Sequence, residues 1–272
     1  MNQLTLHNPF NAPVYYEDTV DSTMNVSRIL ARQGEPHGTV IAAGFQSAGR
    51  GRIKGRSWNM EKGMNLAFTI LLRFPGIENI PRALPLRTGL AISLAIEDFA
   101  PALAGKVFIK WPNDILAAPS AKKMVGILVE ADGGDAHIGI GVNVAQQQFP
   151  DFLQEKVTSI SLAAGREIAS GECYTLLEKI LVRLHAEVGA SGGDHVGGHD
   201  GDWRRRIEER LYQKGEQVCF AEGAADSGKT VTGILAGIGP EGELLIADSG
   251  GTEGKTRMFT TGELLFPPKP LA

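Results

Sequence analysis

The segment MVGILVEADGGDAHIGIGVNV, residues 124–144, predicts a β-hairpin in the middle of the chain. Two runs rich in β-branched and apolar residues, 124–130 and 137–144, flank a turn-forming group from Asp132 to Asp135. Further core strands are expected from the other apolar runs, at 39–45, 64–74 and 106–111. Strands joined by hairpins with few helices between them are typical of an α+β fold. A mixed or antiparallel sheet is therefore predicted rather than a doubly wound one.

Helices are predicted where apolar residues recur at a spacing of 3.6 residues. The stripe in Glu172–Val188 is the most regular one, and Leu84–Phe99 carries a second. Ser22 lies between Asp21 and Thr23, and residues of these types are good helix N-caps, so a short helix is expected to start there. A further helix is expected over 203–212, with its mixed charges on a solvated face.

The chain is expected to divide into two domains, 1–214 and 215–272. Residues 189–202 are rich in glycine, which predicts a flexible linker. His and Asp side chains in that segment are interpreted as solvated rather than as metal ligands, because metal sites need rigid support. Beyond Gly215, short β runs alternate with glycine-rich turns. This pattern predicts a small, barrel-like β module.

A phosphate-binding motif in this module is interpreted as a coincidence. Gly223–Thr230 reads GAADSGKT and fits the pattern GxxxxGK[ST]. A P-loop needs a helix that begins at its Lys-Thr pair and points N–H groups at phosphate. The residues that follow, VTGILAGIGP, are β-branched and glycine-rich and favour a hairpin. A β-turn between two strands is therefore predicted here, and replacement of Lys229 by Ala is expected to leave nucleotide binding nearly intact.

Composition limits the classes of function. The 272 residues carry a net charge of −4 with 43% hydrophobic residues, which suits a globular protein without general affinity for nucleic acid. The chain contains no apolar run of the ~18 residues that a membrane span requires and no leader-like start, so a soluble, cytoplasmic protein is expected. Cys173 and Cys219 have neither CxxC spacing nor paired histidines, and neither a disulfide framework nor a metal site is predicted.

The segment FQSAGRGRIKGRSW, residues 45–58, concentrates positive charge. Cations alternate with glycines and small residues, and residues 36–60 contain no Asp or Glu. Guanidinium groups bind carboxylate and phosphate oxygens in pairs, and glycine lets the backbone approach a ligand closely. The segment, called the arginine loop below, is predicted to wrap an anion. Its glycines and the mutual repulsion of its cations predict disorder in the absence of ligand.

Several motifs resemble, together and in this order, those of the biotin protein ligase family. They are DST at Asp21–Thr23, GRGR with GR.W in the arginine loop, KWPND at Lys110–Asp114, KKMVGILVE at Lys122–Glu130 and GIGVN at Gly139–Asn143. The resemblance covers residues 17 to about 145 and, loosely, the small module. It implies a class II synthetase-like, biotin–lipoate ligase catalytic domain followed by an SH3-like barrel. Because the DST turn lies near the N-terminus, a monofunctional type without an N-terminal DNA-binding domain is expected.

The resemblance implies a two-step acyl transfer with biotin, ATP and Mg²⁺ as the substrate complex and no resident metal. Biotin is activated as biotinyl-5'-AMP and then transferred to a lysine of an acceptor protein, the activity of a biotin–[acetyl-CoA-carboxylase] ligase. The implied partner is the biotin-accepting domain of a carboxylase or decarboxylase, without nucleic acid or membrane. The sequence does not decide whether the protein is a monomer or a homodimer.

Site residues follow from the resemblance, position by position. Ser22, Thr23 and Gln46 are expected to hydrogen-bond the ureido head of biotin, and Trp58 to pack on the adenine side. The expected catalytic residues are Lys123, Arg52 and Asp114. The expected ligand-binding residues are Ser22, Thr23, Met24, Gln46, Gly49, Arg50, Gly51, Arg52, Arg56, Trp58, Asn113, Lys123, Gly126, Gly141 and Asn143. From the residues alone, Trp58 could equally be a core residue, Lys123 a surface lysine, and Asn113 and Asp114 turn formers.

Three features depart from the family pattern. Met24 stands where the family usually has Asn after DST. Ile53 and Lys54 occupy the place of one residue, so the arginine loop is one residue longer. The segment between Asp114 and Lys123 is also extended.

Two alternative functions stay open at this stage. A lipoate or octanoyl transferase of the same broad fold would carry a different acyl chain. A nucleic-acid-binding module would use GRGRIKGR as an RG-type patch, although such patches usually accompany low-complexity sequence or stacking aromatic residues.

Overall fold

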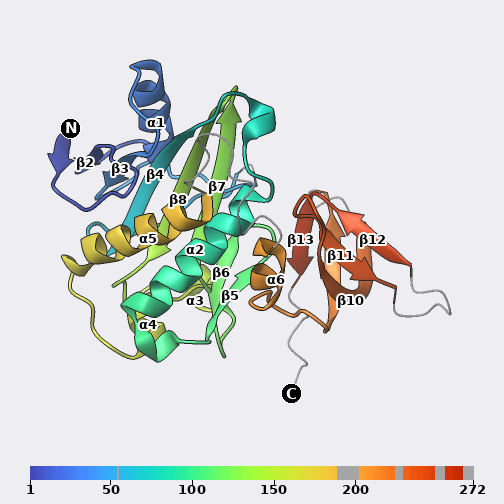
Figure 1. Cartoon of the computed structure of the whole chain (residues 1–272). Coiled ribbons are helices and arrows are strands. Elements are labelled where there is room, and N and C mark those ends of the chain that lie inside the picture. Colours follow the sequence, from blue (N-terminus) through green and yellow to red (C-terminus); the bar gives the residue numbers. More distant parts are fainter. Residues whose placement is uncertain (54, 189–201, 224–228, 249–254, 266–272) are drawn as a thin grey trace.

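The computed structural model describes residues 1–53, 55–188, 202–223, 229–248 and 255–265 (Figure 1). A large mixed sheet forms its centre, with eight strands in the order β1-β2-β3-β4-β8-β7-β6-β5. The strands are β1 (Asn2–Leu4), β2 (Val14–Glu17), β3 (Thr39–Ala43), β4 (Asn65–Arg73), β5 (Val107–Lys110), β6 (Asp114–Ala117), β7 (Lys122–Asp132) and β8 (Asp135–Asn143). In the described part of the chain, β2 and β3 form the parallel pair of this sheet and its other neighbours are antiparallel. The predicted α+β fold with a mixed sheet is confirmed.

The hairpin predicted from residues 124–144 is formed by β7 and β8. Their register pairs Asp132 with Asp135, and the turn between them contains Gly133 in the left-handed region at φ 59°. This is a backbone conformation that glycine adopts at little cost. Because β8 also pairs with β4 along its whole length, the hairpin lies in the interior of the sheet.

Helices cover the two faces of this sheet. They are α1 (Thr23–Arg32), α2 (Leu84–Phe99), α3 (Asp151–Gln154), α4 (Ile160–Ala164), α5 (Glu172–Val188) and α6 (Trp203–Glu208), with short 3₁₀ turns at Ile77–Asn79 and Pro101–Leu103. On one face α2 and α5 pack side by side and share a core with Phe68 and Ile70 of β4 and Ile138 and Ile140 of β8 (Figure 1). Successive strand residues point to opposite faces. Alternate residues of β4 and β8 therefore reach the other face, where α1 lies.

The second sheet has five strands in the order β12-β11-β10-β9-β13, all antiparallel. They are β9 (Gln217–Glu222), β10 (Thr230–Ile238), β11 (Leu244–Ala247), β12 (Thr256–Phe259) and β13 (Gly262–Leu265). We call this sheet the C-terminal module. Thr230 begins strand β10, which pairs antiparallel with β9, so a β-hairpin strand and not the helix of a P-loop follows the GAADSGKT motif. Residues 224–228 of the motif lie outside the described residues. The division of the chain after residue 214 stays a prediction.

One apolar cluster joins the module to the rest of the molecule. Leu86 and Leu90 of α2 and Trp111 after β5 pack in the same buried cluster as Phe220 and Leu235 of the module. The Trp111 indole Nε1–H donates to the Gly242 carbonyl over 3.0 Å. The two sheets therefore share a core, and the position of the module relative to β5 is set by packing (Figure 1).

Three details differ from the sequence prediction or lie beyond it. The helix expected over 203–212 ends at Glu208, because the following segment runs alongside β5: Ile109 N–H donates to the Arg210 carbonyl and Tyr212 N–H to the Ile109 carbonyl. The extended segment after Asp114 contains strand β6, which the sequence analysis did not predict. The linker predicted over 189–202 lies outside the described residues except for Asp202. Among the described helices, none combines the length and apolar composition needed to cross a membrane.

Candidate active site

A cavity opens where the start of α1, the arginine loop and the centre of the large sheet meet. It is lined by Ser22, Thr23, Met24, Gln46, Arg50, Gly51, Arg52, Trp58, Asn113, Lys123, Gly126, Ile127, Leu128, Gly139, Ile140 and Gly141. The lining combines an apolar floor with hydrogen-bonding groups and cations, and the cation Arg50 donates to Asn25 Oδ1 of α1 at 3.1 Å.

Glycines of β7 and β8 make room for this cavity. Gly126 and Gly141 face each other in register. A Cβ on Gly141 would lie 2.4 Å from the Trp58 ring, and a Cβ on Gly139 would lie 2.8 Å from the Met24 sulfur. The indole of Trp58 therefore rests directly on the backbone of the sheet, in space that any side chain at position 141 would fill.

The start of α1 supplies the hydrogen-bonding side of the cavity. Gln46 Oε1 accepts from Thr23 N–H at 2.9 Å and from Thr23 Oγ1 at 3.1 Å, and Thr69 of β4 donates to Thr23 Oγ1 at 2.8 Å. Ser22 precedes the helix in an extended conformation, and among the described residues its side chain makes no capping hydrogen bond. Hydroxyl and amide groups are thus held at the helix N-terminus, where N–H groups lack helical partners.

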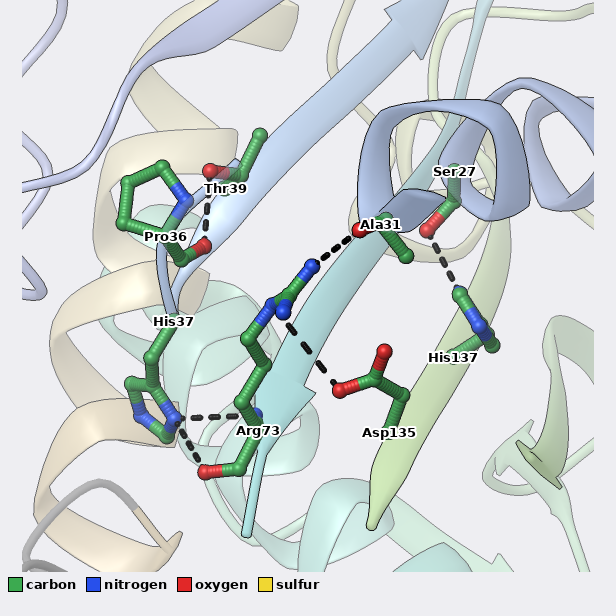
Figure 2. Close-up of polar contacts among 8 residues, drawn as sticks. All are labelled: Ser27, Ala31, Pro36, His37, Thr39, Arg73, Asp135 and His137. Carbon is green, nitrogen blue, oxygen red and sulfur yellow. Dashed lines mark hydrogen bonds and ion pairs between the residues drawn. The ribbon is translucent and has the colours of Figure 1, made fainter. Parts of the chain in front are cut away.

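Two contacts farther along α1 fix the helix to the sheet (Figure 2). Ser27 Oγ lies 2.8 Å from His137 Nδ1, and Arg73 donates to the Ala31 carbonyl near the end of the helix. Arg73 also lies 3.8 Å from the Asp135 carboxylate. Burial lowers the pKa of His137, and the nearby charge of Arg28 lowers it further. A neutral His137 therefore helps to hold the helix whose first turn lines the cavity.

Lys123 and the turn at residues 112–114, which reads PND, contribute polar groups to the cavity. Lys123 Nζ lies 2.6 Å from Asp114 Oδ1 and 6.0 Å from the centre of the Trp58 ring. Asn113 donates through Nδ2 to the Ile127 carbonyl at 2.7 Å and accepts the Ile127 N–H through its own carbonyl at 3.0 Å. The turn after β5 is thereby fixed against β7, and Lys123 is held beside the aromatic wall.

The arginine loop folds back on itself. Gly51 N–H donates to the Arg56 carbonyl at 2.8 Å, and Trp58 N–H to the Gly49 carbonyl at 3.0 Å. Gly55 has φ 87°, a conformation that favours glycine. Arg50 and Arg52 line the cavity. Lys54, whose insertion the sequence analysis singled out, lies outside the described residues.

Comparison with known proteins identifies the family. The sequence model of the Biotin/lipoate A/B protein ligase family matches residues 16–145. The chain is 30% identical over 241 residues to the biotin–[acetyl-CoA-carboxylase] ligase of Paracoccus denitrificans, covering 86% of this chain and 93% of that one. The chain belongs to the biotin protein ligase family.

Other members of the biotin protein ligase family agree with this assignment. The bifunctional ligase/repressor BirA of Bacillus spizizenii is 38% identical over 161 residues, covering 56% of this chain. The match spans about half the length of this relative, 47%. The biotin protein ligase of Aquifex aeolicus, solved in complex with biotin and ATP, superposes with a TM-score of 0.71 at 27% identity, covering 93% of this chain and 97% of that one. The large mixed sheet with a second sheet is thus the fold of the biotin protein ligases.

Most residues predicted from the resemblance to the biotin protein ligases meet in this cavity. They are Ser22, Thr23, Met24, Gln46, Arg50, Gly51, Arg52, Trp58, Asn113, Lys123, Gly126 and Gly141. Within the described part of the chain, four predicted residues do not line it. Asp114 contacts the lining residue Lys123 without lining the cavity itself. Gly49 lies against Trp58. Asn143 is buried and donates to the Thr158 carbonyl. Arg56 points to Glu263 of the C-terminal module.

The sequence analysis missed four lining residues, Ile127, Leu128, Gly139 and Ile140. Gly139 was within reach of sequence reasoning, because it stands two positions before Gly141 and so points to the same face of β8. Ile127, Leu128 and Ile140 read as ordinary core residues, and their contact with the cavity depends on how the sheet is covered. Among the described residues, no group of three or more His, Cys, Asp or Glu side chains is arranged to hold a metal.

Proposed function

We propose that the chain is an ATP-dependent ligase that activates biotin as biotinyl-5'-AMP and transfers the biotinyl group to a lysine of an acceptor protein. The observation that carries this proposal is the cavity itself. Its lining brings the hydrogen-bonding groups of Thr23 and Gln46 together with the cations Arg50, Arg52 and Lys123, over a floor of glycine. A ligand with a polar head, an apolar chain and an anionic tail fits this distribution. The match to the Aquifex ligase, which was solved with biotin and ATP, supports the same reading.

In the first step, a biotin carboxylate oxygen would attack the α-phosphorus of ATP, and pyrophosphate would leave. Two anions must approach each other, and Arg50, Arg52 and Lys123 would offset their repulsion. Thr23 is oriented by Gln46 and Thr69 and would hold the ureido head. Trp58 would pack on the adenine side.

In the second step, the lysine amine of the acceptor would attack the acyl carbonyl, and AMP would leave. Lys123 would polarise this carbonyl. Asp114, 2.6 Å from Lys123, would orient its ammonium group and would serve the incoming lysine. Mg²⁺ would enter with ATP and neutralise phosphate charge, and Asn113 and Asp114 would be candidate oxygen donors to it. The acceptor would be the biotin-accepting domain of a carboxylase or decarboxylase.

We propose that the catalytic part is class II synthetase-like and that the C-terminal module is an SH3-like barrel. A cytoplasmic location is likewise proposed.

Isotope exchange tests the function directly. Purified protein should exchange labelled pyrophosphate into ATP only when biotin is present, and Arg52→Ala should lower the exchange rate by about one to two decades. Addition of a biotin-accepting domain should then give a biotinylated lysine detectable by mass. Exchange that depends on lipoate instead of biotin would favour the lipoate alternative, to which the family description also extends. Salt-sensitive RNA binding without any exchange would favour the nucleic-acid alternative.

A further inference from the structure

The edge strand β13 of the C-terminal module lies against the arginine loop. Arg56 donates from Nη1 and Nη2 to the two carboxylate oxygens of Glu263, at 3.0 and 2.9 Å. Arg52 donates from Nη2 to the Gly262 carbonyl at 3.0 Å. Two neighbouring residues of one strand thus hold two arginines of a loop that is more than 200 positions away in the sequence.

Glu263 lies among cations from two different elements. Its side chain is 21% exposed, whereas that of Arg56 is 55% exposed. Burial alone would raise the pKa of Glu263, but the hydrogen bonds and charge of Arg56, with the charges of Lys110 and Arg52, outweigh burial and lower it. The carboxylate is therefore ionised at neutral pH.

Lys110 is a buried cation whose charge acts on Glu263. This residue of β5 is 6% exposed, and burial lowers its pKa, while the negative charges of Asp114 and Glu263 act in the opposite direction. Asp114 in turn pairs with Lys123 in the cavity. Positive and negative groups thus alternate from Arg56 through Glu263, Lys110 and Asp114 to Lys123.

We propose that Glu263 is a positioning residue for ATP binding: the C-terminal module uses it to hold the arginine loop beside the cavity before ligand arrives. Within the described chain Arg56 does not line the cavity, whereas Arg50 and Arg52 do. The pairing of Arg56 with Glu263 would therefore hold the segment that carries these two arginines. A loop already held in place loses less conformational freedom when ATP binds. The contact also offsets the repulsion among the loop cations. This proposal rests on the proposed function, since ATP is the ligand that the loop would meet.

Kinetics of Glu263→Gln test the proposal. The variant keeps the size of the side chain and removes its charge. It is expected to raise the KM for ATP about three- to tenfold, because a partly exposed ion pair contributes little more free energy than this. The value of kcat should change less than about twofold. Arg56→Gln should have a similar effect, and the double variant should be no worse than the larger single effect, because the two residues act as one unit.

Glu241→Gln is the matched control. Glu241 lies in the same module and bridges to Arg82 just before α2 at 2.8 Å, away from the arginine loop. Its substitution should leave the KM for ATP and the melting temperature unchanged. An equal rise of KM in both variants would overturn the proposal, because it would indicate general loosening of the module.

Limited proteolysis of the ligand-free protein separates this proposal from the proposed function. Trypsin should cleave after Arg50 and Arg52 several-fold faster in Glu263→Gln than in wild type, at unchanged melting temperature. Equal cleavage rates together with an unchanged or lower KM for ATP would overturn the role of Glu263. If wild type shows no biotin-dependent exchange, the proposed function fails, while the proteolysis rates still report whether Glu263 holds the loop.

Discussion

At the scale of single residues, the close approach of Trp58 to Gly141 determines the shape of the cavity. Gly141→Ala should displace the indole, because the new Cβ would lie 2.4 Å from its Cε2 atom. Overpacking of this kind should weaken the binding of biotin and ATP by about tenfold or more, measured by titration calorimetry. Gly171→Ala is the control, since no described atom lies within 4 Å of the Cβ it would add. Unchanged affinity in Gly141→Ala would show that Trp58 moves freely.

Lys123 and its neighbour Lys122 offer a second test at this scale. Lys123→Gln should lower the rate of biotin-dependent exchange by about one to two decades, because a charge-assisted hydrogen bond to the reacting anions is lost. Lys122 points elsewhere and donates to the Gln154 carbonyl at 2.6 Å. Lys122→Gln should therefore stay near the wild-type rate. Equal losses in the two variants would mean that the position of Lys123 has no special role.

At the scale of elements, helix α1 is held against the sheet by His137, which contacts Ser27, and by Arg73, which donates to the Ala31 carbonyl and also contacts His37. Both His137 beneath α1 and His37 beside Arg73 have pKa values lowered from 6.5, in each case first by burial (Figure 2). His37 Nδ1 lies 3.0 Å from the Arg73 backbone nitrogen and 3.1 Å from the Arg73 carbonyl oxygen. Burial therefore favours the neutral form of both histidines.

The sign of the resulting pH dependence follows from proton linkage. With lowered folded-state pKa values, the unfolded chain binds more protons than the folded chain as pH falls through about 6.5, so stability falls. The free energy of unfolding by urea should be lower at pH 5.5 than at pH 7.5. In His137→Gln the difference between the two pH values should be smaller than in wild type. An identical difference in wild type and variant would exclude His137 as a contributor.

For the whole molecule, the shared apolar cluster predicts that both sheets unfold together. Calorimetry should show a single transition, because Trp111, Phe220 and Leu86 belong to one core. Trp111→Ala should lower stability by about 3–5 kcal/mol through loss of buried contacts. Met258→Ala, at a site 61% exposed on the same module, should change it by less than about 0.5 kcal/mol. Two separate transitions in wild type would show that the module is an independent domain.

Local sequence pattern was sufficient to predict several helices and strands and many of the residues that line the cavity. The bounds of α2 and α5 agree with the apolar stripes over 84–99 and 172–188. Apolar residues that recur every 3.6 positions lie on one side of a helix, and that side packs against the core. The β7–β8 hairpin follows from two β-branched runs and a glycine turn. The motif residues that line the cavity were also predicted, since each stands at the end or on one face of an element that could be placed from sequence.

Tertiary packing decided what no local pattern contains. Arg56 pairs with Glu263, because the second sheet docks on Trp111 and brings β13 to the loop, and its contact with ligand stays a prediction. The helix after Trp203 stops at Glu208, because the next residues bond to the edge of β5. Periodicity and turn chemistry act over a few residues, so the sequence determines the elements and the motif positions. Which cation meets which carboxylate 207 positions away depends on how two sheets share one core.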